Sequence, residues 1–536
     1  MPDDFDADVL IVGAGPSGLA LAAELELRGH RCILVERNER TGVQPRAKTT
    51  NVRSMTHLRR WRLADKVRAR SPLGPDFPRD VVFTTGLFDV PIHTFHDALA
   101  TRPGKRDVFP EHAEFVPQYV VEGVLADHVA ARCDLRFRTR MTGFVQDDRG
   151  VTATLTGPDG TETRLRARYL AGADGGRSRV REALGIEMQG KRDLMTFATL
   201  ILRVPGLAEA PGLRRALFHW IVNPAAASVI GPMDRDDRWY WARPAAPDTP
   251  TEVLMDDARR AIGPGFDPAL LARDNWVVHS LLAESYRRGR VFLLGDACHL
   301  HSPFGGHGMN LGIGDAADLG WKLSAALQGW GTDTLLDSYQ TERRQAHEAV
   351  IDSATRNFAS LSDHFADPRL MQTGPEADAF RAATAQEIER RKAPEFRSLG
   401  LVLGYRYTGS PAVIEEPGAA PELHVSDYRP TARPGHLLPH AWLADGASLY
   451  DRIGPGFTLL VTAGGDAGDL PERAAARGIP LTVVAAPGLR GAMEADFVLV
   501  RPDQHVAWRG DQLPPDDRLL DVMQGGHVAE PMRKTA

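Results

Sequence analysis

Cysteine is scarce in this sequence of 536 residues. The three cysteines, Cys32, Cys133 and Cys298, are far apart, and none belongs to a C-x-x-C pair. The sequence therefore predicts neither a disulfide framework nor dithiol chemistry, and we expect free thiols in a reducing, cytoplasmic setting.

Long apolar runs are also missing. No window approaches the roughly 18 consecutive apolar residues of a membrane-spanning helix, so no membrane partner is expected. The chain begins MPDDFDADVLIVGAG, with acidic residues before the first apolar run. This start predicts a strand and argues against a signal peptide.

A surplus of basic charge is absent as well. The formal net charge is −6, and lysine and arginine are spread along the chain, so we expect no nucleic-acid partner. In the one dense basic stretch, residues 59–70, basic residues alternate with other residue types, as they do on the solvent-exposed face of a helix. We interpret this stretch as a surface helix. The length predicts two or three domains.

The start of the chain carries a nucleotide-binding pattern. Residues 8–13, DVLIVG, are typical of a strand buried on both faces. Gly13, Gly15 and Gly18 follow at G-x-G-x-x-G spacing, and after a helical pattern a second strand ends at Glu36. The first glycine makes a tight turn, the second lets a pyrophosphate approach the backbone, and the third lets helix and strand pack closely.

This pattern favours FAD or NAD over NADP, because Glu36 would accept hydrogen bonds from a ribose diol and repel a 2′-phosphate. The start of the helix would offer free N–H groups and a positive dipole end to the phosphates. We therefore predict a set of dinucleotide contacts at Gly13, Gly15, Pro16, Ser17, Gly18, Glu36 and Arg37.

Two further aspartates follow predicted strands. Asp174 precedes Gly175 after the apolar run YLAG, and Asp296 follows Gly295 after RVFLL. Parallel α/β sheets bind ligands at the carboxyl ends of their strands, so both acids are candidate ligand contacts. Either could instead cap a helix.

In order and separation, these three motifs resemble those of class A flavoprotein monooxygenases, the single-component FAD-dependent hydroxylases of the para-hydroxybenzoate, phenol and polyketide type. The resemblance covers residues 6–347. It implies that Asp174 belongs to a motif near the flavin pyrophosphate and the visiting nicotinamide nucleotide, and that Asp296 holds ribityl or ribose hydroxyls. It also implies contacts from Arg46 to the flavin side and from Gln118 to the adenosine end of FAD. A surface arginine and a plain helix-start residue stay open for these two.

The stretch GDACHLHSPFGGHGMNLGIGDA continues from Asp296 into a helix. Its glycines permit a close backbone approach, and a helix start suits an anion such as the reduced flavin, charged at its N1–C2=O side. The resemblance implies that this loop lies against the flavin's pyrimidine edge. The predicted contacts are Pro303, Gly308, Met309 and Asn310.

Three histidines stand in the same stretch. His299 and His301 could supply two zinc ligands, but the resemblance marks His299 as scaffold, and we predict no metal. His307 is a candidate for proton handling or substrate contact, with a plain loop histidine as the alternative. No G-x-S-x-G elbow is present, which argues against a serine hydrolase.

Residues 186–284 read as strands separated by Pro, Gly and Asp turns. We interpret them as a mostly antiparallel substrate domain that forms one wall of a pocket. Its aromatic candidates for facing a substrate, half of which should point away by strand alternation, are Phe218, Trp220, Trp239, Tyr240 and Trp241. The catalytic acid or base is not identified, and its weak candidates are His96, His219, Tyr240 and His307.

The carboxy-terminal part, residues 396–536, resembles the thioredoxin-like domain of the larger phenol and polyketide hydroxylases. It has no cysteine, so packing, assembly or cofactor shielding are its open roles. The expected fold is therefore α/β and α+β. A Rossmann-like FAD-binding domain of residues 1–185 and 285–395 holds an interleaved substrate domain of residues 186–284, which also takes part of 75–110.

The resemblance implies an FAD-dependent monooxygenase that consumes NADPH or NADH and molecular oxygen. It would hydroxylate a small phenolic or polyketide aromatic substrate through a flavin C4a-hydroperoxide, as a monomer or homodimer. A flavin oxidase or dehydrogenase without oxygen insertion stays open. So does a flavin-dependent halogenase, because WYWARP fits the W-x-W-x-I-P signature except at Arg243, and Lys48 is an early lysine.

Overall fold

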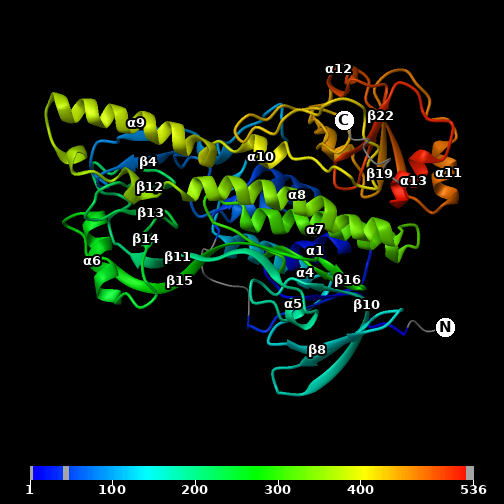
Figure 1. Ribbon diagram of the computed structural model, residues 1–536, viewed down its shortest axis with the longest axis horizontal. Helices are drawn as coiled ribbons and strands as arrows, with labels where there is room; N and C mark the ends of the chain where they lie inside the picture. The colour runs from blue at the N-terminus through cyan, green and yellow to red at the C-terminus, as the bar shows by residue number, and fades with distance from the viewer. Residues whose placement is uncertain (1–3, 40–46, 527–536) are drawn as a thin grey trace, which may run out of the picture.

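Three sheets of four or more strands organise the computed structural model, which describes residues 4–39 and 47–526 (Figure 1). The first sheet is built around β1, which is buried along its length and pairs in parallel with β2 and β10. Its path is β16-β17-β10-β1-β2-β7, with β9 paired to β10 and β8 to β9. The strands are β1 (Ala7–Val12), β2 (Cys32–Val35), β7 (Asp134–Arg136), β8 (Arg140–Gln146), β9 (Val151–Thr156), β10 (Glu162–Gly172), β16 (Arg287–Arg288) and β17 (Val291–Leu293).

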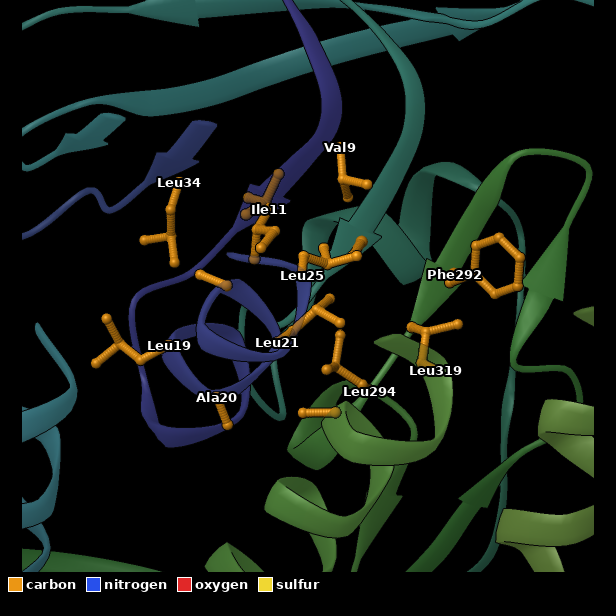
Figure 2. Close-up of a cluster of buried hydrophobic side chains, with 14 of the residues drawn as sticks. Val9, Ile11, Leu19, Ala20, Leu21, Leu25, Leu34, Phe292, Leu294 and Leu319 are labelled. Carbon is orange, nitrogen blue, oxygen red and sulfur yellow. The ribbon is translucent and has the colours of Figure 1, made fainter. Parts of the chain in front are cut away.

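Helix α1 (Pro16–Glu26) covers this sheet and packs against α7 (Gly308–Leu327). Figure 2 shows Leu21 and Leu25 of α1 between Ile11 of β1 and Leu319 of α7, and all four side chains are almost fully buried. Burying each such side chain contributes about 1.5–3 kcal/mol. The other helices here are α4 (Gln118–Ala130), α5 (Arg179–Ala183) and α8 (Asp333–Phe358).

The second sheet has the order β18-β15-β11-β14-β13-β12-β4-β5 and is antiparallel except between β12 and β4. Residues 81–95 therefore belong to it. Helix α6 (Thr251–Ile262) covers one face, and α9 (Pro375–Phe396) packs on the other (Figure 1). The strands are β4 (Val81–Thr84), β5 (His93–Phe95), β11 (Met188–Arg203), β12 (Phe218–Ile221), β13 (Ser228–Pro232), β14 (Arg238–Pro244), β15 (Ala269–Ala283) and β18 (His299–Leu300).

The short segment that carries the Gly295-Asp296 motif joins the two sheets. Strand β17 ends at Leu293 in the first sheet, and β18 begins at His299 in the second. The Gly295-Asp296 pair lies between them, so this motif stands at the junction of the sheets. The small sheet of β3 (Thr49–Thr50) and β6 (Glu114–Phe115) lies beside it, tied to α7 through Asn310.

The interpretation of residues 59–70 as a surface helix is wrong. Helix α2 (Val52–Arg60) ends there, Arg62 has a φ of 60°, and α3 (Ala64–Ala69) follows. Trp61 is buried, and its indole N–H and Arg60 both donate to Glu24 of α1 at 2.6 Å. The basic residues of this stretch alternate with buried apolar residues because the arginines pair with acidic side chains, and the stretch is not a solvated helix face.

The third sheet has the order β20-β19-β21-β22. Its strands β19 and β20 are parallel and joined through α11, whereas β21 and β22 run antiparallel, in agreement with the predicted thioredoxin-like domain. This unit packs against α7 and α8 through Trp321 and Leu335 (Figure 1). Its elements are α10 (Leu399–Leu403), β19 (Phe457–Val461), α11 (Leu470–Ala476), β20 (Leu481–Ala485), α12 (Arg490–Met493), β21 (Phe497–Val500), β22 (Val506–Gly510) and α13 (Arg518–Gln524).

The α/β and α+β architecture is thus confirmed, and the domain boundaries at residues 185, 284 and 395 stay a prediction. All three cysteines are free thiols. Within the described ranges, no helix combines the length and the apolarity needed to cross a membrane.

Candidate active site

The loop between β1 and α1 has one glycine that faces open space. An ideal Cβ on Gly13 would lie 2.4 Å from the carbonyl oxygen of Ala173, and one on Gly18 would lie 2.0 Å from that of Gly13. At Gly15 no heavy atom lies within 4 Å of that position. No side chain caps the start of α1, where Pro16 follows. The loop therefore offers an approach to backbone N–H groups, as a pyrophosphate requires.

Glu36 lies at the end of β2 beside this loop. Its Oε2 accepts a hydrogen bond from the Ala14 N–H and its Oε1 one from the Asn38 N–H, both at 2.9 Å. A carboxylate has about four lone-pair sites, so two remain for ribose hydroxyls. Arg37 is exposed at the same strand end, and Arg46 lies outside the described residues. The residues present thus fit the adenosine half of FAD.

Asp174 and Asp296 reach the same loop from two other strands. The backbone of Asp174 lies against Gly13, and its carboxylate accepts from Ser178, the N-cap of α5, and from the N–H groups of Arg179 and Val180 in its first turn. The contacts of Asp174 in the structure are therefore those of a residue that stabilises the start of a helix, the alternative role given above. Asp296 is exposed, and the adjacent Gly295 has no room for a Cβ because Ser17 Oγ would lie 2.3 Å away.

Gln118 holds a neighbouring segment in place. Its Oε1 accepts from the Ala47 N–H at 3.3 Å, and its Nε2 donates to Glu122 at 2.8 Å. The side chain thus links the start of α4 to the strand that precedes α2. A contact from Gln118 to the adenosine end of a cofactor stays a prediction.

Asn310 fixes the glycine-rich loop before α7. Its Oδ1 accepts from the Asn51 N–H at 2.8 Å, and its Nδ2 donates to the carbonyls of Thr49 and Gly306 at 2.8 and 2.6 Å. Helix α7 begins at Gly308, and no side chain caps it, so its positive end faces the loop. Met309 is buried beside Asn310. This helix start could hold an anionic group with backbone N–H donors.

His299 belongs to a buried network around Asp315. Asp315 Oδ2 accepts from His299 and from the Gly295 N–H, both at 3.0 Å, and Oδ1 accepts from Arg343 and His347, both at 2.8 Å. Burial alone would raise the pKa of Asp315, but His347 and Arg343 hold it well below its ordinary value. The carboxylate is an anchor between α7, α8 and the Gly295-Asp296 motif.

This network leaves no ligand set for a metal. Asp315 lies near Cys298 and His299, but four donors already use its carboxylate. Burial raises the pKa of the Cys298 thiol well above its ordinary value, so a thiolate ligand is disfavoured.

We expect His299→Gln to lower the free energy of unfolding by about 1.5–3 kcal/mol, because a buried hydrogen bond to a charged group is lost. Urea denaturation of the FAD-bound protein measures it. His96→Gln is the control, since His96 is 68% exposed and contacts Asp80 on the surface. Stability that falls on treatment with a chelator would contradict the assignment of His299 to a hydrogen-bond scaffold.

His307 stands immediately before α7. Its ring is buried, and burial lowers its pKa to about 4, so it is a neutral imidazole near pH 7. Its Nε2 has no hydrogen-bond partner among the described residues. A role in proton handling stays a prediction.

The second sheet divides the predicted aromatic residues between two faces. Phe218, Trp220 and Tyr240 face α9 and the glycine-rich loop, and Trp220 lies 6.0 Å from Phe304 by ring centroids. Val229 of β13 lies on the same face.

Three predicted candidates lie on the opposite face. Trp239 and Trp241 pack beneath α6, away from the glycine-rich loop, so the halogenase-like W-x-W pair is part of this core, and a contact of either residue with substrate stays a prediction. His219 points the same way, its Nε2–H donates to the Arg214 carbonyl at 2.9 Å, and the ring is held neutral because burial lowers its pKa to about 4. Strand alternation explains the orientation of all three side chains, since every second residue of a strand points toward the face that α6 covers.

A cavity of about 330 Å³ opens on the loop side of this sheet. Its walls include Phe197, Trp220, Pro244 and Leu361, with Phe304 contributed by the glycine-rich loop. Ligand pockets are typically about 300–1,000 Å³, a range that this cavity meets, and its lining also includes the polar residues Arg243, Asp257 and Asp363.

Sequence reasoning missed Phe304 and the Asp315 network. Phe304 was inside the quoted stretch, next to Pro303, and its aromatic character was the available signal. The partners of Asp315 come from two other segments, residues 295–299 and helix α8, so no local pattern could reveal them.

Comparison with known proteins finds similarity along nearly the whole chain. Residues 6–354 match the family model described as FAD binding domain, and residues 431–525 match that of the aromatic-ring hydroxylase, C-terminal. The tetracenomycin B2 monooxygenase-dioxygenase of Streptomyces olivaceus is 34% identical over 97% of this chain and 98% of its own length. The putative polyketide hydroxylase of Streptomyces halstedii is 33% identical over 96% and 95%.

Two solved structures extend the similarity to three dimensions. The rebeccamycin biosynthetic enzyme RebC with reduced flavin has a TM-score of 0.90 at 35% identity, covering 97% of this chain and 99% of that one. The ternary complex of aklavinone-11 hydroxylase with FAD and aklavinone has a TM-score of 0.83 at 30% identity, covering 98% and 99%.

Proposed function

This chain belongs to the family of FAD-dependent aromatic-ring hydroxylases, and from this premise we propose that its substrate is a polycyclic phenol of the polyketide type. It is an FAD-dependent monooxygenase that uses molecular oxygen, with NADPH or NADH as the reductant. The relatives named above carry polyketide and aklavinone substrates in their names, which supports this substrate class.

One observation carries the proposal: the aromatic cavity adjoins the loop that fits the flavin. Phe304 belongs to both, because it lines the cavity and directly follows Pro303. Phe197 and Trp220 of the second sheet line the same cavity, and their rings pack against Phe304 with centroids 5.8 and 6.0 Å away. A flat aromatic molecule could stack on these rings with one edge toward the loop.

Some groups of the chain bind the cofactor, and others position the substrate and exclude water. We propose that Gly15 and the start of α1 bind the pyrophosphate, that Glu36 and Asp296 bind hydroxyls, and that the N–H groups near Met309 and Asn310 hold the pyrimidine edge. When bound, FAD supplies the activation of dioxygen for transfer of one oxygen atom to the ring. The buried aromatic walls position the substrate and keep water out.

We also propose a cytoplasmic setting and a monomer or homodimer. The three free cysteines support a reducing compartment.

The test is oxygen insertion with ¹⁸O₂. Purified FAD-bound protein is mixed with NADPH or NADH and with aklavinone, or with phenol as a single-ring comparison. We expect one ¹⁸O atom in the product from aklavinone and little reaction with phenol, measured by mass spectrometry. NAD(P)H oxidation that yields only hydrogen peroxide would instead identify an oxidase, and a product carrying chlorine would identify a halogenase.

A further inference from the structure

Lys48 stands where the glycine-rich loop meets the second sheet. Its carbonyl accepts a hydrogen bond from the Val116 N–H at 2.7 Å, which fixes its backbone beside β6. The next residue, Thr49, accepts from Asn310 of α7 at 2.8 Å and lies against Gly306. The lysine is therefore held next to the loop that fits the flavin.

The side chain reaches across to the sheet. Its Nζ lies 3.7 Å from the centroid of the Tyr240 ring on β14. Tyr240 is 3% exposed and packs with Ile201, Met233 and Phe218. Since Phe218 and Tyr240 share the sheet face that carries the aromatic cavity, the ammonium group lies over that same face, beside the cavity and outside its immediate lining.

Within residues 4–39 and 47–526, no acid pairs with this lysine. Among the described residues, Nζ has no hydrogen bond or ion pair, and its contact with Tyr240 is a cation–π interaction. Lys48 is half-buried, and the two fully buried lysines Lys322 and Lys392 differ from it, because Lys322 lies 2.9 Å from Asp318 and Lys392 lies 2.7 Å from Glu395. Lys392 also reaches the cavity wall, over the Trp220 ring, but it is paired.

Burial lowers the pKa of Lys48 to about 8. The group is therefore still mostly protonated at neutral pH. A desolvated ammonium without a counter-charge is costly, and a bound anion would remove that cost.

We propose that Lys48 binds an anionic oxygen of the aromatic substrate, so that the substrate is an aromatic acid or acidic phenol bound in its ionised form. This inference rests on the proposed function. An ammonium offers three donors, and a charge-assisted hydrogen bond to a phenolate or carboxylate would complete its coordination while Tyr240 supports its other side. An ionised hydroxyl also makes the ring richer in electrons, which favours attack by an electrophilic oxygen.

Matched ligands test the charge preference directly. Oxidised FAD-bound protein is titrated with 1-hydroxy-2-naphthoate and its methyl ester, and with 2-hydroxy- and 2-methoxy-1,4-naphthoquinone, by the change in flavin absorbance. The first pair probes a carboxylate and the second an acidic hydroxyl. We expect Lys48→Met to weaken the anionic member of at least one pair by about tenfold or more and the neutral member by less than about twofold. Lys48→Arg should restore the preference.

Lys105→Met is the matched control, because Lys105 also lies over an aromatic ring, that of Trp442 at 4.5 Å, but is exposed. It should leave all four affinities unchanged. Equal weakening of both members of each pair, or no weakening, overturns the proposal. So does a loss of FAD affinity without a change in charge preference, which would assign Lys48 to the cofactor. The titration involves no turnover, so its failure is distinguishable from failure of ¹⁸O insertion.

Discussion

Replacing Gly15 by alanine should weaken FAD binding by about 10- to 100-fold and leave the apoprotein folded. Gly15 has φ −76° and ψ −179°, a conformation open to alanine, and its Cβ would meet no protein atom within 4 Å. The methyl group would therefore occupy only the space through which a pyrophosphate approaches the backbone. Loss of one charge-assisted hydrogen bond there costs about 1.5–3 kcal/mol, which gives this range of affinity.

Gly18→Ala provides the contrast. Its Cβ would lie 2.0 Å from the carbonyl oxygen of Gly13, so the apoprotein itself should be destabilised. Equilibrium dialysis against FAD and urea unfolding of the apoprotein measure the two effects separately. Wild-type FAD affinity in Gly15→Ala would show that the pyrophosphate does not approach the backbone at this residue.

Local chemistry explains why the first nucleotide-binding unit could be predicted. Gly13 and Gly18 are required by contacts within about five residues or with the adjacent strand, so their spacing alone encodes the turn. The strand before them is buried on both faces, and a continuous apolar run records that directly. The strands of the cysteine-free third domain could be predicted in the same way, because they coincide with short apolar runs of the sequence.

The faces of the second sheet could not be predicted in the same way. Alternation along β14 separates Tyr240 from Trp239 and Trp241, but it does not say which set meets a helix. That choice is made by α6, which follows β14 in the chain and covers one face with Leu254 and Ala258. His219 illustrates the same point, since it pairs with Ile230 of the core that α6 covers.

The contacts between domains are also invisible to local pattern. Arg59–Arg70 resembled a solvated face because the acids that pair with its arginines come from elsewhere, such as Glu24 and Glu111. Arg60 also donates to the carbonyl of Pro502 at 2.7 Å, which links α2 to the third domain. A single sequence gives no signal for partners separated by 442 residues.

A buried ionic cluster fastens the third domain to α7 and α8. Arg501 is fully buried and donates two hydrogen bonds to Glu342, at 2.6 and 2.7 Å. It also contacts Asp318 at 3.2 Å and Asp503 at 2.7 Å. Lys322 is the second cation, paired with Asp318 and Glu342. These five residues include three acids and two bases, so each cation is needed to balance the group.

Arg501→Met should therefore lower the free energy of unfolding by about 3–5 kcal/mol, because it leaves buried carboxylates without their partner. Arg518→Met is the control. It removes an arginine of the same domain whose pair with Asp516 is at least half exposed, and should cost at most about 1 kcal/mol. Urea denaturation followed by circular dichroism would measure both. A loss equal to that of the control would show that the cluster does not hold the domains together.

The pH dependence of the same variant tests the charge balance. Burial alone would raise the pKa of Glu342, but Arg501 and Lys322 lower it from 4.5 to about 2. A carboxyl whose pKa is lowered on folding stabilises the protein above its unfolded pKa, and this contribution is lost as the pH falls through the folded value. Wild-type stability should thus decline between about pH 4.5 and 2 on account of this group. In Arg501→Met the folded pKa of Glu342 should rise toward its unfolded value, so this part of the decline should become smaller. An unchanged acid-side slope would show that Arg501 does not set the charge of Glu342.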